Sequence, residues 1–461
     1  MRFLPLLIGL TGPAAAALLA PPGGLSPDAW STAGIAFMMG VWWMAGALPL
    51  AATALAPLVL APVFRLGPIG AVAGSYVHPL LFLFLGGFLI GRAIERWGLH
   101  RRIALWILGI VGNRPERLIG GVMLATAFLS LWISNTAATI VMLPIAASLT
   151  LGRPEGDRFS TALMLGVAYA ATIGGMGSLI GTPPNALFAA YVGQTYGRDG
   201  DIGFAQWAAV GLPVAGLLLG AAWVVLAHLT PGVRHAKATG AIVESPGLWS
   251  RAERRVAMVA GLTAFAWISR PFAESLLPGV EVNDAMIAIA GGAALFLLPS
   301  GAGGRLLDLS ALKGLRWDIL VLFGGGLALA GLIDRSGLAG WIGAHVVLAE
   351  ALPVWLVILV LAGTIVYVGE LASNTAMAAV FLPGAGAAAT SIGVEPIGFL
   401  WPIVLAASVG FMLPVATPPN AIVMDSPAVT RVSMLRAGAL LDLIGIGVTV
   451  AAGLLLVPLL L

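Results

Sequence analysis

Long apolar segments follow one another along the chain, and no other feature constrains the fold as strongly. A membrane-spanning helix needs about 20 mostly apolar residues, and such stretches recur over the whole length. Only 9% of the 461 residues are charged, whereas a soluble chain carries roughly 25%. The segments lie at about 3–20, 31–48, 50–64, 78–97, 118–149, 160–193, 206–229, 256–272, 284–299, 317–334, 354–388, 394–424 and 434–461. We predict an all-α polytopic membrane protein, because the segments are continuous and lack the alternating pattern of transmembrane β-strands.

The N-terminal stretch Met1–Ala20 combines one arginine, an apolar run and small residues, as a signal peptide does. Because apolar segments continue through the rest of the chain, we interpret this stretch as the first membrane span.

The composition excludes several kinds of site. The chain has no cysteine, which rules out disulfides and thiolate metal sites. Its five histidines are scattered, without a pair at metal-ligand spacing, so we expect no bound cofactor. The net charge of +3 does not indicate a nucleic-acid partner, because the basic residues lie where membrane topology would place them.

Two short polar phrases interrupt the apolar segments, and each occurs twice. Ser134-Asn135-Thr136 returns as Ser373-Asn374-Thr375, and Thr182-Pro183-Pro184-Asn185 returns as Thr417-Pro418-Pro419-Asn420. Proline lacks a backbone donor and breaks a helix, and broken backbone at membrane depth is tolerated only where it is buried in protein or lines a cavity. A single Ser-Asn-Thr would more often only bond neighbouring helices, but matched copies favour one shared site.

The two halves keep a constant register around these phrases. Gly86-Gly87 and Gly325-Gly326 differ by 239 positions (325 − 86), and so do the two Ser-Asn-Thr phrases (373 − 134). The proline pairs differ by 235 (418 − 183). This register indicates an internal duplication, and paired, interrupted apolar segments are a sequence sign of a transporter binding site.

Basic residues predict the orientation, since cytoplasmic loops carry most Lys and Arg. Four groups occur: Arg92, Arg96, Arg101, Arg102, Arg114 and Arg117; Arg234, Lys237, Arg251, Arg254 and Arg255; Arg305, Lys313 and Arg316; and Arg431 with Arg436. With all four groups in the cytoplasm, the hairpin of the first half enters from inside and that of the second half from outside. We predict an inverted repeat of eleven transmembrane helices with two re-entrant hairpins, a cytoplasmic N-terminus and an extracytoplasmic C-terminus.

This organisation divides the chain into three parts. Residues 1–230 form the N-terminal half, with a hairpin at about 118–149 and a broken helix at about 160–193. Residues 231–255 form a cytoplasmic linker. Residues 256–461 form the C-terminal half, with a hairpin at about 354–388 and a broken helix at about 394–424.

The broken helices offer groups for both an anion and a cation. A helix N-terminus carries unpaired N–H donors and a partial positive charge, which suit a carboxylate. Backbone carbonyls, serine hydroxyls and asparagine side-chain carbonyls suit a hard cation. The candidate Na⁺ ligands are Ser130, Ser134, Asn135 and Gly181 in the first half, and Ser373, Asn374 and Ala416 in the second. Gly369 stands where the repeat would place a partner of Ser130, so we expect the first Na⁺ site to be better defined.

No Lys or Arg lies within the four phrases. A doubly negative ligand would be costly there unless it were paired, and bound Na⁺ would supply the missing positive charge. Each ligand would then bind better when the other is present, which is the condition for symport.

Other positions allow more than one interpretation. Glu370 fits a buried pair that holds the hairpin as well as it fits ion binding. For Asp442 we favour a helix–helix hydrogen bond. We interpret the Gly86-Gly87 and Gly325-Gly326 pairs as close helix packing, and Trp42-Trp43 as an interface or packing pair.

The phrases resemble the divalent anion:sodium symporter family, which includes dicarboxylate and citrate carriers. The resemblance covers nearly the whole chain and rests on Trp42-Trp43-Met44, Ala47-Leu48-Pro49-Leu50, Leu85-Gly86-Gly87-Phe88, both Ser-Asn-Thr phrases, and both Thr-Pro-Pro-Asn phrases with the preceding Gly181 and Ala416. It implies a homodimer in which each scaffold carries an elevator-type transport domain. It also implies that substrate carboxylates bind at Asn135, Thr136, Asn374 and Thr375, with Thr182, Pro183, Thr417 and Pro418 beside them.

We therefore expect a Na⁺-coupled importer of small dianionic carboxylates, such as succinate, malate or fumarate, in the inner (plasma) membrane. A dicarboxylate exchanger and a citrate or sulfate transporter are the alternatives within the family. The exchangers carry cationic side chains in place of sodium ligands, and the four phrases contain none. An intramembrane enzyme is disfavoured, because the chain has no His pair, no Cys and no Ser–Lys or paired Asp arrangement near the phrases. A channel would need a continuous pore, whereas Pro-broken hairpins from opposite sides favour alternating access.

Overall fold

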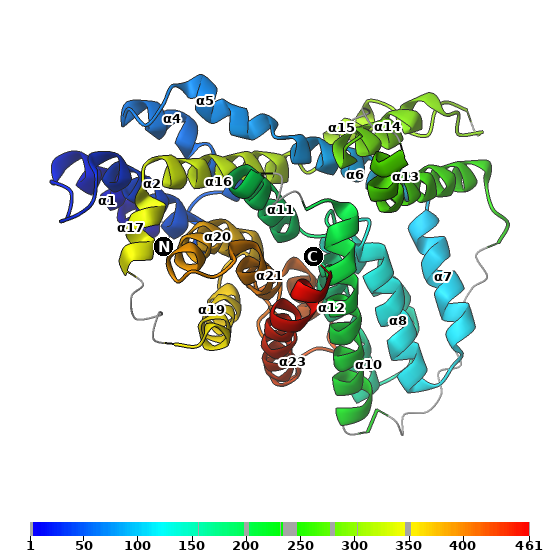
Figure 1. The fold of residues 1–461 in the computed structure, drawn as a ribbon. Coiled ribbons are helices and arrows are strands. Elements are labelled where there is room, and N and C mark those ends of the chain that lie inside the picture. The colour runs from blue at the N-terminus through cyan, green and yellow to red at the C-terminus, as the bar shows by residue number, and fades with distance from the viewer. Residues whose placement is uncertain are drawn as a thin grey trace.

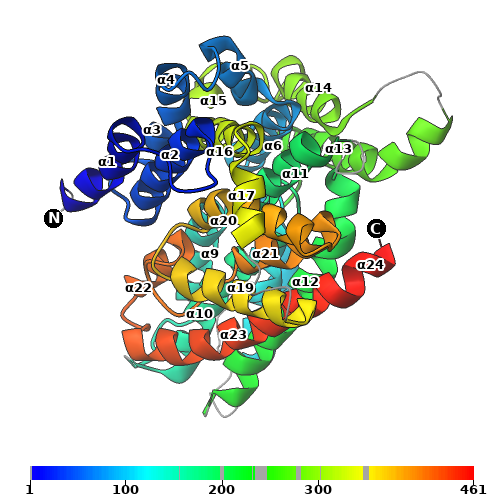
Figure 2. The same cartoon turned by 60° about the vertical axis from the view of Figure 1, so that its left-hand side comes forward.

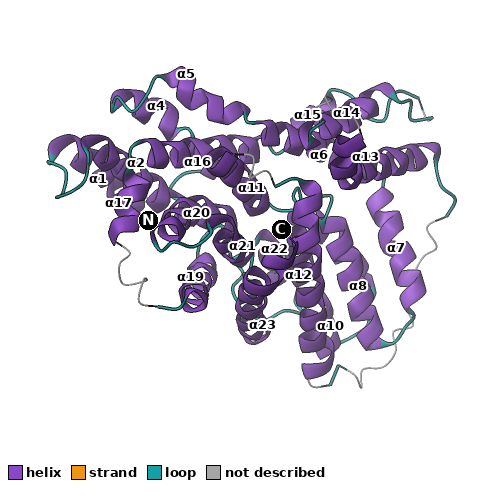
Figure 3. Ribbon diagram, in the orientation of Figure 1, coloured by secondary structure: helices purple, strands orange, loops and turns teal. Residues whose placement is uncertain are grey.

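Helices make up the regular structure of the computed structural model (Figure 3). The structure describes residues 3–154, 156–197, 202–230, 232–233, 247–276, 282–301, 303–345 and 352–460. Within these ranges, β-structure is limited to an isolated bridge between Pro299 and Arg305. The predicted all-α fold class is confirmed.

The same order of helices occurs in both halves. The first half contains α6 (Pro79–Arg96), α7 (Leu99–Val111), α8 (Pro115–Ser130), α9 (Asn135–Ser148), α10 (Arg158–Met176), α11 (Pro183–Tyr196) and α12 (Phe204–Val224). The second half contains α16 (Trp317–Arg335), α17 (Leu338–His345), α19 (Val354–Gly369), α20 (Asn374–Ser391), α21 (Pro396–Ala406), α22 (Pro418–Met424) and α23 (Arg431–Ala451). Helices α8 and α19 begin 239 residues apart (354 − 115), as the two Ser-Asn-Thr phrases do.

The remaining helices precede the repeats, join them or follow them. They are α1 (Phe3–Leu18), α2 (Pro27–Met44), α3 (Leu50–Ala54), α4 (Ala56–Val63), α5 (Ile69–Ala73), α13 (Arg251–Leu276), α14 (Asp284–Leu297), α15 (Ser310–Lys313) and α24 (Val457–Leu460). Helix α13 begins inside the predicted linker 231–255, so the last part of that linker is helical. Residues 234–246 of the linker, with Arg234 and Lys237, lie outside the described residues.

The helices are interrupted at the polar phrases. Helix α8 ends at Ser130 and α9 begins at Asn135, while α19 ends at Gly369 and α20 begins at Asn374. The breaks before α11 and α22 end directly before the proline pairs. Each phrase therefore starts a new helix instead of lying within one.

Within the described residues, five helices are long and apolar enough to span a membrane: Ile69–Arg96, Arg158–Met176, Phe204–Leu229, Trp317–Arg335 and Arg431–Leu460. Other apolar helices are shorter, and several are halves of a broken pair. The count of eleven spans and the re-entrant course of the hairpins stay predictions.

Two groups of helices lie side by side. Figures 1 and 2 both show α1, α2, α4, α5, α6 and α16 on one side of the molecule, and α10, α12, α19, α21 and α23 on the other. Helix α10 belongs to the core, since nearly all of its side chains are buried. Helix α16 contacts α11 and α20 across the border between the groups.

The glycine pairs permit close helix packing, as the sequence predicts. A methyl group on Gly86 would overlap the backbone of Ala288 in α14. One on Gly325 would overlap the backbone of Ala54 in α3. Side chains larger than hydrogen would therefore push these helices apart.

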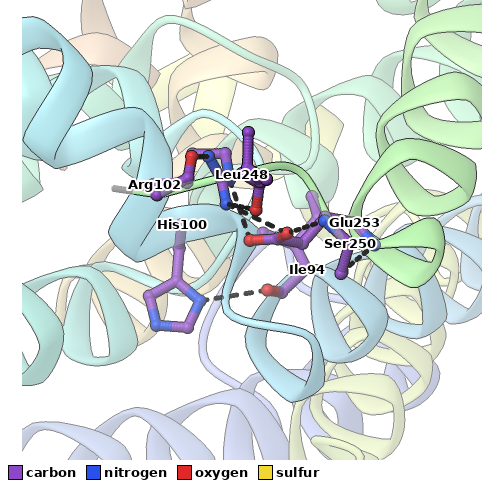
Figure 4. A network of polar contacts seen from close by, with 7 residues as sticks. Ile94, His100, Arg102, Leu248, Ser250 and Glu253 are labelled. Carbon is purple, nitrogen blue, oxygen red and sulfur yellow. Dashed lines mark hydrogen bonds and ion pairs between the residues drawn. The ribbon is translucent and has the colours of Figure 1, made fainter. Parts of the chain in front are cut away.

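A buried arginine joins α7 of the first half to the end of the linker and the start of α13 (Figure 4). Arg102 of α7 is only 8% exposed, and its Nε lies 2.9 Å from Glu253 Oε1 of α13. It also donates to the carbonyl oxygens of Gly247 and Leu248, at 2.9 and 2.8 Å. Burial raises the pKa of Glu253, but hydrogen bonds from Arg102 and Ser250 outweigh this effect and hold the pKa below its ordinary value of 4.5.

We expect Gly325→Ala to lower the melting temperature of the purified protein, because the added methyl group would overlap Ala54. Gly363→Ala is the matched control, since Gly363 lies within α19 and an added methyl group there meets no atom within 4 Å. Replacing an unconstrained helical glycine with alanine stabilises by roughly 0.5–1 kcal/mol. Thermal denaturation in one detergent should thus give shifts of opposite sign, and equal shifts would contradict the close packing.

We expect the Arg102–Glu253 pair to stabilise the fold at neutral pH and to lose its effect in acid. Because the folded pKa of Glu253 lies below 4.5, its contribution is present above the unfolded pKa and is lost as the pH falls through the folded value. The difference in melting temperature between the wild type and Glu253→Gln should shrink between about pH 7 and about pH 4. A difference that does not change with pH would contradict this role.

Candidate functional site

The four polar phrases face one cavity of about 640 Å³. All eight residues expected to bind substrate line it: Asn135, Thr136, Thr182, Pro183, Asn374, Thr375, Thr417 and Pro418. The structure therefore brings the phrases of both halves to one place, as their repetition predicts.

Four helices begin at this cavity. The N-cap residues are Ser134 for α9, Thr182 for α11, Ser373 for α20 and Thr417 for α22. Thr182 and Thr417 have nearly the same backbone, with φ −139° and ψ 144° in one and φ −138° and ψ 149° in the other. The two halves thus build the same helix start from the same phrase.

These helix starts suit an anion to different degrees. The first N–H groups of a helix lack an intrahelical partner and carry a partial positive charge. Helices α11 and α22 begin with two prolines, which have no N–H to donate. Helices α9 and α20 begin with Asn and Thr, which keep their donors. The Ser-Asn-Thr starts are therefore the better places for a carboxylate.

Buried oxygen atoms converge beside the start of α9. The hydroxyl oxygen of the fully buried Ser130 lies 2.6 Å from the carbonyl oxygen of Ala171 and 2.8 Å from a terminal atom of the Asn135 amide. That amide position lies 3.3 Å from the carbonyl oxygens of both Ala171 and Gly181. When the amide oxygen occupies this position, four oxygen atoms lie together, and oxygens of these kinds are the ligands that a hard cation prefers.

The opposite orientation of the same amide satisfies the cluster without an ion. Turned by 180°, the Asn135 nitrogen donates to Ser130 Oγ, to Ala171 and to Gly181. With the oxygen turned inward, the amide faces other oxygen atoms and would need a cation among them, whereas the turned amide is satisfied by hydrogen bonds alone. The oxygen atoms gathered here are of the kind that a Na⁺ ion would accept as ligands.

Glycines make this cluster possible. A methyl group on Gly181 would overlap the carbonyl oxygen of Gly175, and one on Gly175 would overlap the side chain of Asn135. The backbone approaches the cluster closely because both positions lack a side chain.

Ser134, the fourth predicted ligand, has another contact. Its hydroxyl oxygen accepts from the Ala137 N–H at 3.2 Å and so caps α9. The structure thus joins Ser130, Asn135 and Gly181, adds the Ala171 carbonyl, and uses the Ser134 side chain at the helix start.

The second predicted ion site has fewer side-chain ligands. Asn374 Oδ1 is buried, and no hydrogen-bond partner is found for it within the described part of the chain. A methyl group on Gly410 would lie 3.4 Å from Ala416 Cβ and 3.9 Å from Asn374 Oδ1, so these residues gather around Gly410. Ser373 lines the cavity, and its side chain does not cap α20.

The asparagine at the end of each Thr-Pro-Pro-Asn phrase stabilises the helix break before that phrase. Asn185 Nδ2 donates to the carbonyl oxygens of Gly175 and Ser178, at 3.0 and 2.8 Å. Asn420 Nδ2 donates to those of Gly410 and Leu413, at 3.2 and 3.0 Å. Both side chains are fully buried, so each asparagine satisfies carbonyl groups that a broken helix leaves unpaired.

Two buried carboxylates hold the chain between α21 and α22. Glu370 accepts from the N–H groups of Met412 and Leu413, at 2.9 and 2.7 Å. Asp442 accepts from the N–H of Phe411 at 3.0 Å. The helix–helix hydrogen bond predicted for Asp442 is not what the structure shows, because its partner, the Phe411 N–H, lies in the non-helical segment between α21 and α22. For Glu370, these contacts support the interpretation that it holds the local structure.

Sequence reasoning missed part of the cavity wall. The missed residues are Trp43, Met44, Ala45, Gly46, Leu48, Pro49 and Leu50 near α2 and α3, and Arg316, Asp318, Ile319 and Leu322 at the start of α16. Trp43 packs as predicted, with its indole N–H donating to Leu50 at 3.1 Å, yet it also lines the cavity. The motif Ala47-Leu48-Pro49-Leu50, on which the family resemblance partly rests, could have pointed to the first group. No motif marks Arg316.

A family model described as the sodium:sulfate symporter transmembrane region matches residues 1–461. The sodium-dependent dicarboxylate transporter SdcS of Staphylococcus saprophyticus is 36% identical over 476 residues, covering 98% of this chain and 90% of that protein. The protein of the same name from Staphylococcus aureus strain NCTC 8325 is 34% identical over 433 residues, covering 89% of this chain and 82% of that protein.

The crystal structure of the YdaH transporter of Alcanivorax borkumensis is similar in fold, with a TM-score of 0.62. The similarity covers 91% of this chain and 98% of that one, at 18% sequence identity. This likeness supports a membrane-transporter fold.

We expect Na⁺ to raise the melting temperature of the purified protein more than K⁺ does at equal ionic strength, because an ion that binds only the folded state stabilises it by mass action. Ser130→Ala should reduce this Na⁺-dependent shift, since it removes one oxygen of the cluster. Ser148→Ala is the matched control, because the exposed Ser148 hydroxyl bonds only locally, to Ile145. An equal Na⁺ shift in the wild type and Ser130→Ala would contradict the assignment.

Proposed function

Because the chain belongs to the sodium:sulfate symporter family, we propose that it imports small dianionic carboxylates together with Na⁺, with succinate, malate and fumarate as the expected substrates. The two staphylococcal relatives are, by name, sodium-dependent dicarboxylate transporters. The chain is a multi-pass membrane transporter and not an enzyme.

The observation that carries this proposal is the meeting of two helix starts and the oxygen cluster beside Asn135 at one cavity. The starts of α9 and α20 present N–H donors to the cavity, and each lies beside a candidate cation site. One carboxylate of a dicarboxylate binds at Asn135 and Thr136, and the other binds at Asn374 and Thr375. The threonines and prolines of the other two phrases complete the walls.

Asn135 couples the ion to the substrate. It is the first residue of α9 and lines the cavity, while its side-chain amide belongs to the oxygen cluster. Bound Na⁺ holds the amide oxygen inward, fixes the start of α9 and adds positive charge beside the anion. Because each ligand stabilises the arrangement that the other needs, their affinities are linked.

Transport requires the cavity to open to each side of the membrane in turn. We assign the group with α6 and α16 to a scaffold that dimerises. We assign the other group, together with the helices that begin at the four phrases, α9, α11, α20 and α22, to a transport domain that moves as an elevator. Contacts between the groups include Gly87 against Ile180 and Gly326 against Leu187, and glycines make a smooth surface for sliding. The cytoplasmic N-terminus, the extracytoplasmic C-terminus, the eleven spans and the inverted repeat belong to the same proposal.

The alternatives are a dicarboxylate exchanger and a citrate or sulfate transporter. We expect a C4 dicarboxylate to span the gap between the two Ser-Asn-Thr starts, whereas sulfate would need fewer and more convergent donors. Exchange is disfavoured because Arg316, the cation that lines the cavity, comes from the start of α16 and not from the candidate ion ligands.

We expect purified protein in proteoliposomes to take up labelled succinate when an inward Na⁺ gradient is applied. Asn135→Ala and Asn374→Ala should lower the initial rate by more than about tenfold, since each removes an amide that is proposed to bind both ligands. Asn113→Ala, at an exposed position between α7 and α8, should leave the rate unchanged.

Size-exclusion profiles of all variants show whether the assembly stays folded. Uptake that is independent of Na⁺ but stimulated by preloaded dicarboxylate would replace symport with exchange. Normal transport by either site variant would place the site elsewhere.

A further inference from the structure

Two charged side chains from outside the polar phrases line the transport cavity. Arg316 is the N-cap residue of α16, and Asp318 lies in the first turn of this helix. Of the described residues that line the cavity, these two are the only ones with charged side chains. An anion in the cavity therefore shares its walls with one fixed positive and one fixed negative charge.

The two side chains form a two-point ion pair. Arg316 Nε donates to Asp318 Oδ1 at 3.0 Å, and Nη2 donates to Oδ2 at 2.9 Å. The side chains are 47% and 55% exposed, and exposed pairs of this kind add little to stability. Asp318 occupies the side edge of the guanidinium, so the end edge formed by Nη1 and Nη2 is suited to a second carboxylate.

We propose that this pair sets the charge selectivity of the cavity: Arg316 binds a carboxylate of the incoming substrate, and Asp318 offsets the arginine charge so that dianions are preferred over trianions. The inference rests on the proposed function of the same cavity. It adds a selectivity residue that belongs to none of the four phrases.

The charges in the cavity explain the preference. The polar phrases contribute no charged side chain, and Na⁺ supplies the positive charge that a dianion needs. An arginine without a partner would add one more positive charge and favour a third carboxylate. Asp318 cancels this charge at long range, while the guanidinium still offers directed donors at contact distance.

The test uses the full-length protein in proteoliposomes and three variants: Arg316→Gln, Asp318→Asn and the double variant. The KM for labelled succinate and the inhibition constant of the citrate trianion are measured at low ionic strength. Arg316→Gln should raise the KM and Asp318→Asn should lower it, each by roughly threefold or more. The double variant should keep a KM above that of the wild type but below that of Arg316→Gln, because it restores the net charge without restoring the guanidinium donors.

Citrate provides a second readout. The inhibition constant of the trianion should change more than the KM of the dianion, since an electrostatic effect grows with ligand charge. Added choline chloride should reduce the differences by screening. Arg114→Gln is the control, because Arg114 is also an N-cap arginine, at α8, but does not line the cavity.

Equal constants in all variants would overturn the proposal, and so would a higher KM for Asp318→Asn. Asp318→Asn alone still tests the sign if Arg316→Gln fails to elute as a folded protein. Wild-type protein without Na⁺-dependent succinate uptake would contradict the proposed function itself. Wild-type uptake with unchanged variants would contradict only the selectivity pair.

Discussion

Every backbone N–H and C=O group inside a membrane needs a partner, and four helix breaks make this requirement hard to meet. Asn185 and Asn420 donate to carbonyls exposed by the proline breaks. Glu370 and Asp442 accept from N–H groups of the second break. The starts of α9 and α20 and the oxygen atoms beside Asn135 lie at the same breaks. The candidate sites for an anion and a cation therefore share these breaks.

The two halves share the same order of helices and breaks but differ in the side chains beside the breaks. In the first half, the Ser130 hydroxyl completes an oxygen cluster with Asn135 and Gly181. In the second half, Gly369 supplies no hydroxyl, and the neighbouring Glu370 serves as a brace. The two candidate ion sites of the repeat are therefore unequal in their oxygen atoms, in line with the expectation that the first would be better defined.

The sequence was enough to predict the helix breaks and the residues that meet at the cavity, because proline pairs and Ser-Asn-Thr phrases within apolar segments act locally and recur in both halves. It did not reveal the Ala171 carbonyl, since any residue in that helix has one. It assigned Ser134 to the ion site, although helix capping competes for the same hydroxyl. The sequence also did not predict that Arg316 lines the cavity, because this residue comes to the cavity only through the packing of α16 beside the phrases.

The most direct measurement is a cryo-electron microscopy map of the protein in nanodiscs with saturating Na⁺ and succinate. We expect elongated density between the starts of α9 and α20, with one end near Asn135 and the other near Asn374. We also expect ion density at the cluster of Ser130, Asn135 and Gly181, and its loss when K⁺ replaces Na⁺. Succinate density outside this cavity, or bound succinate with no ion beside it, would contradict coupled binding at the helix breaks.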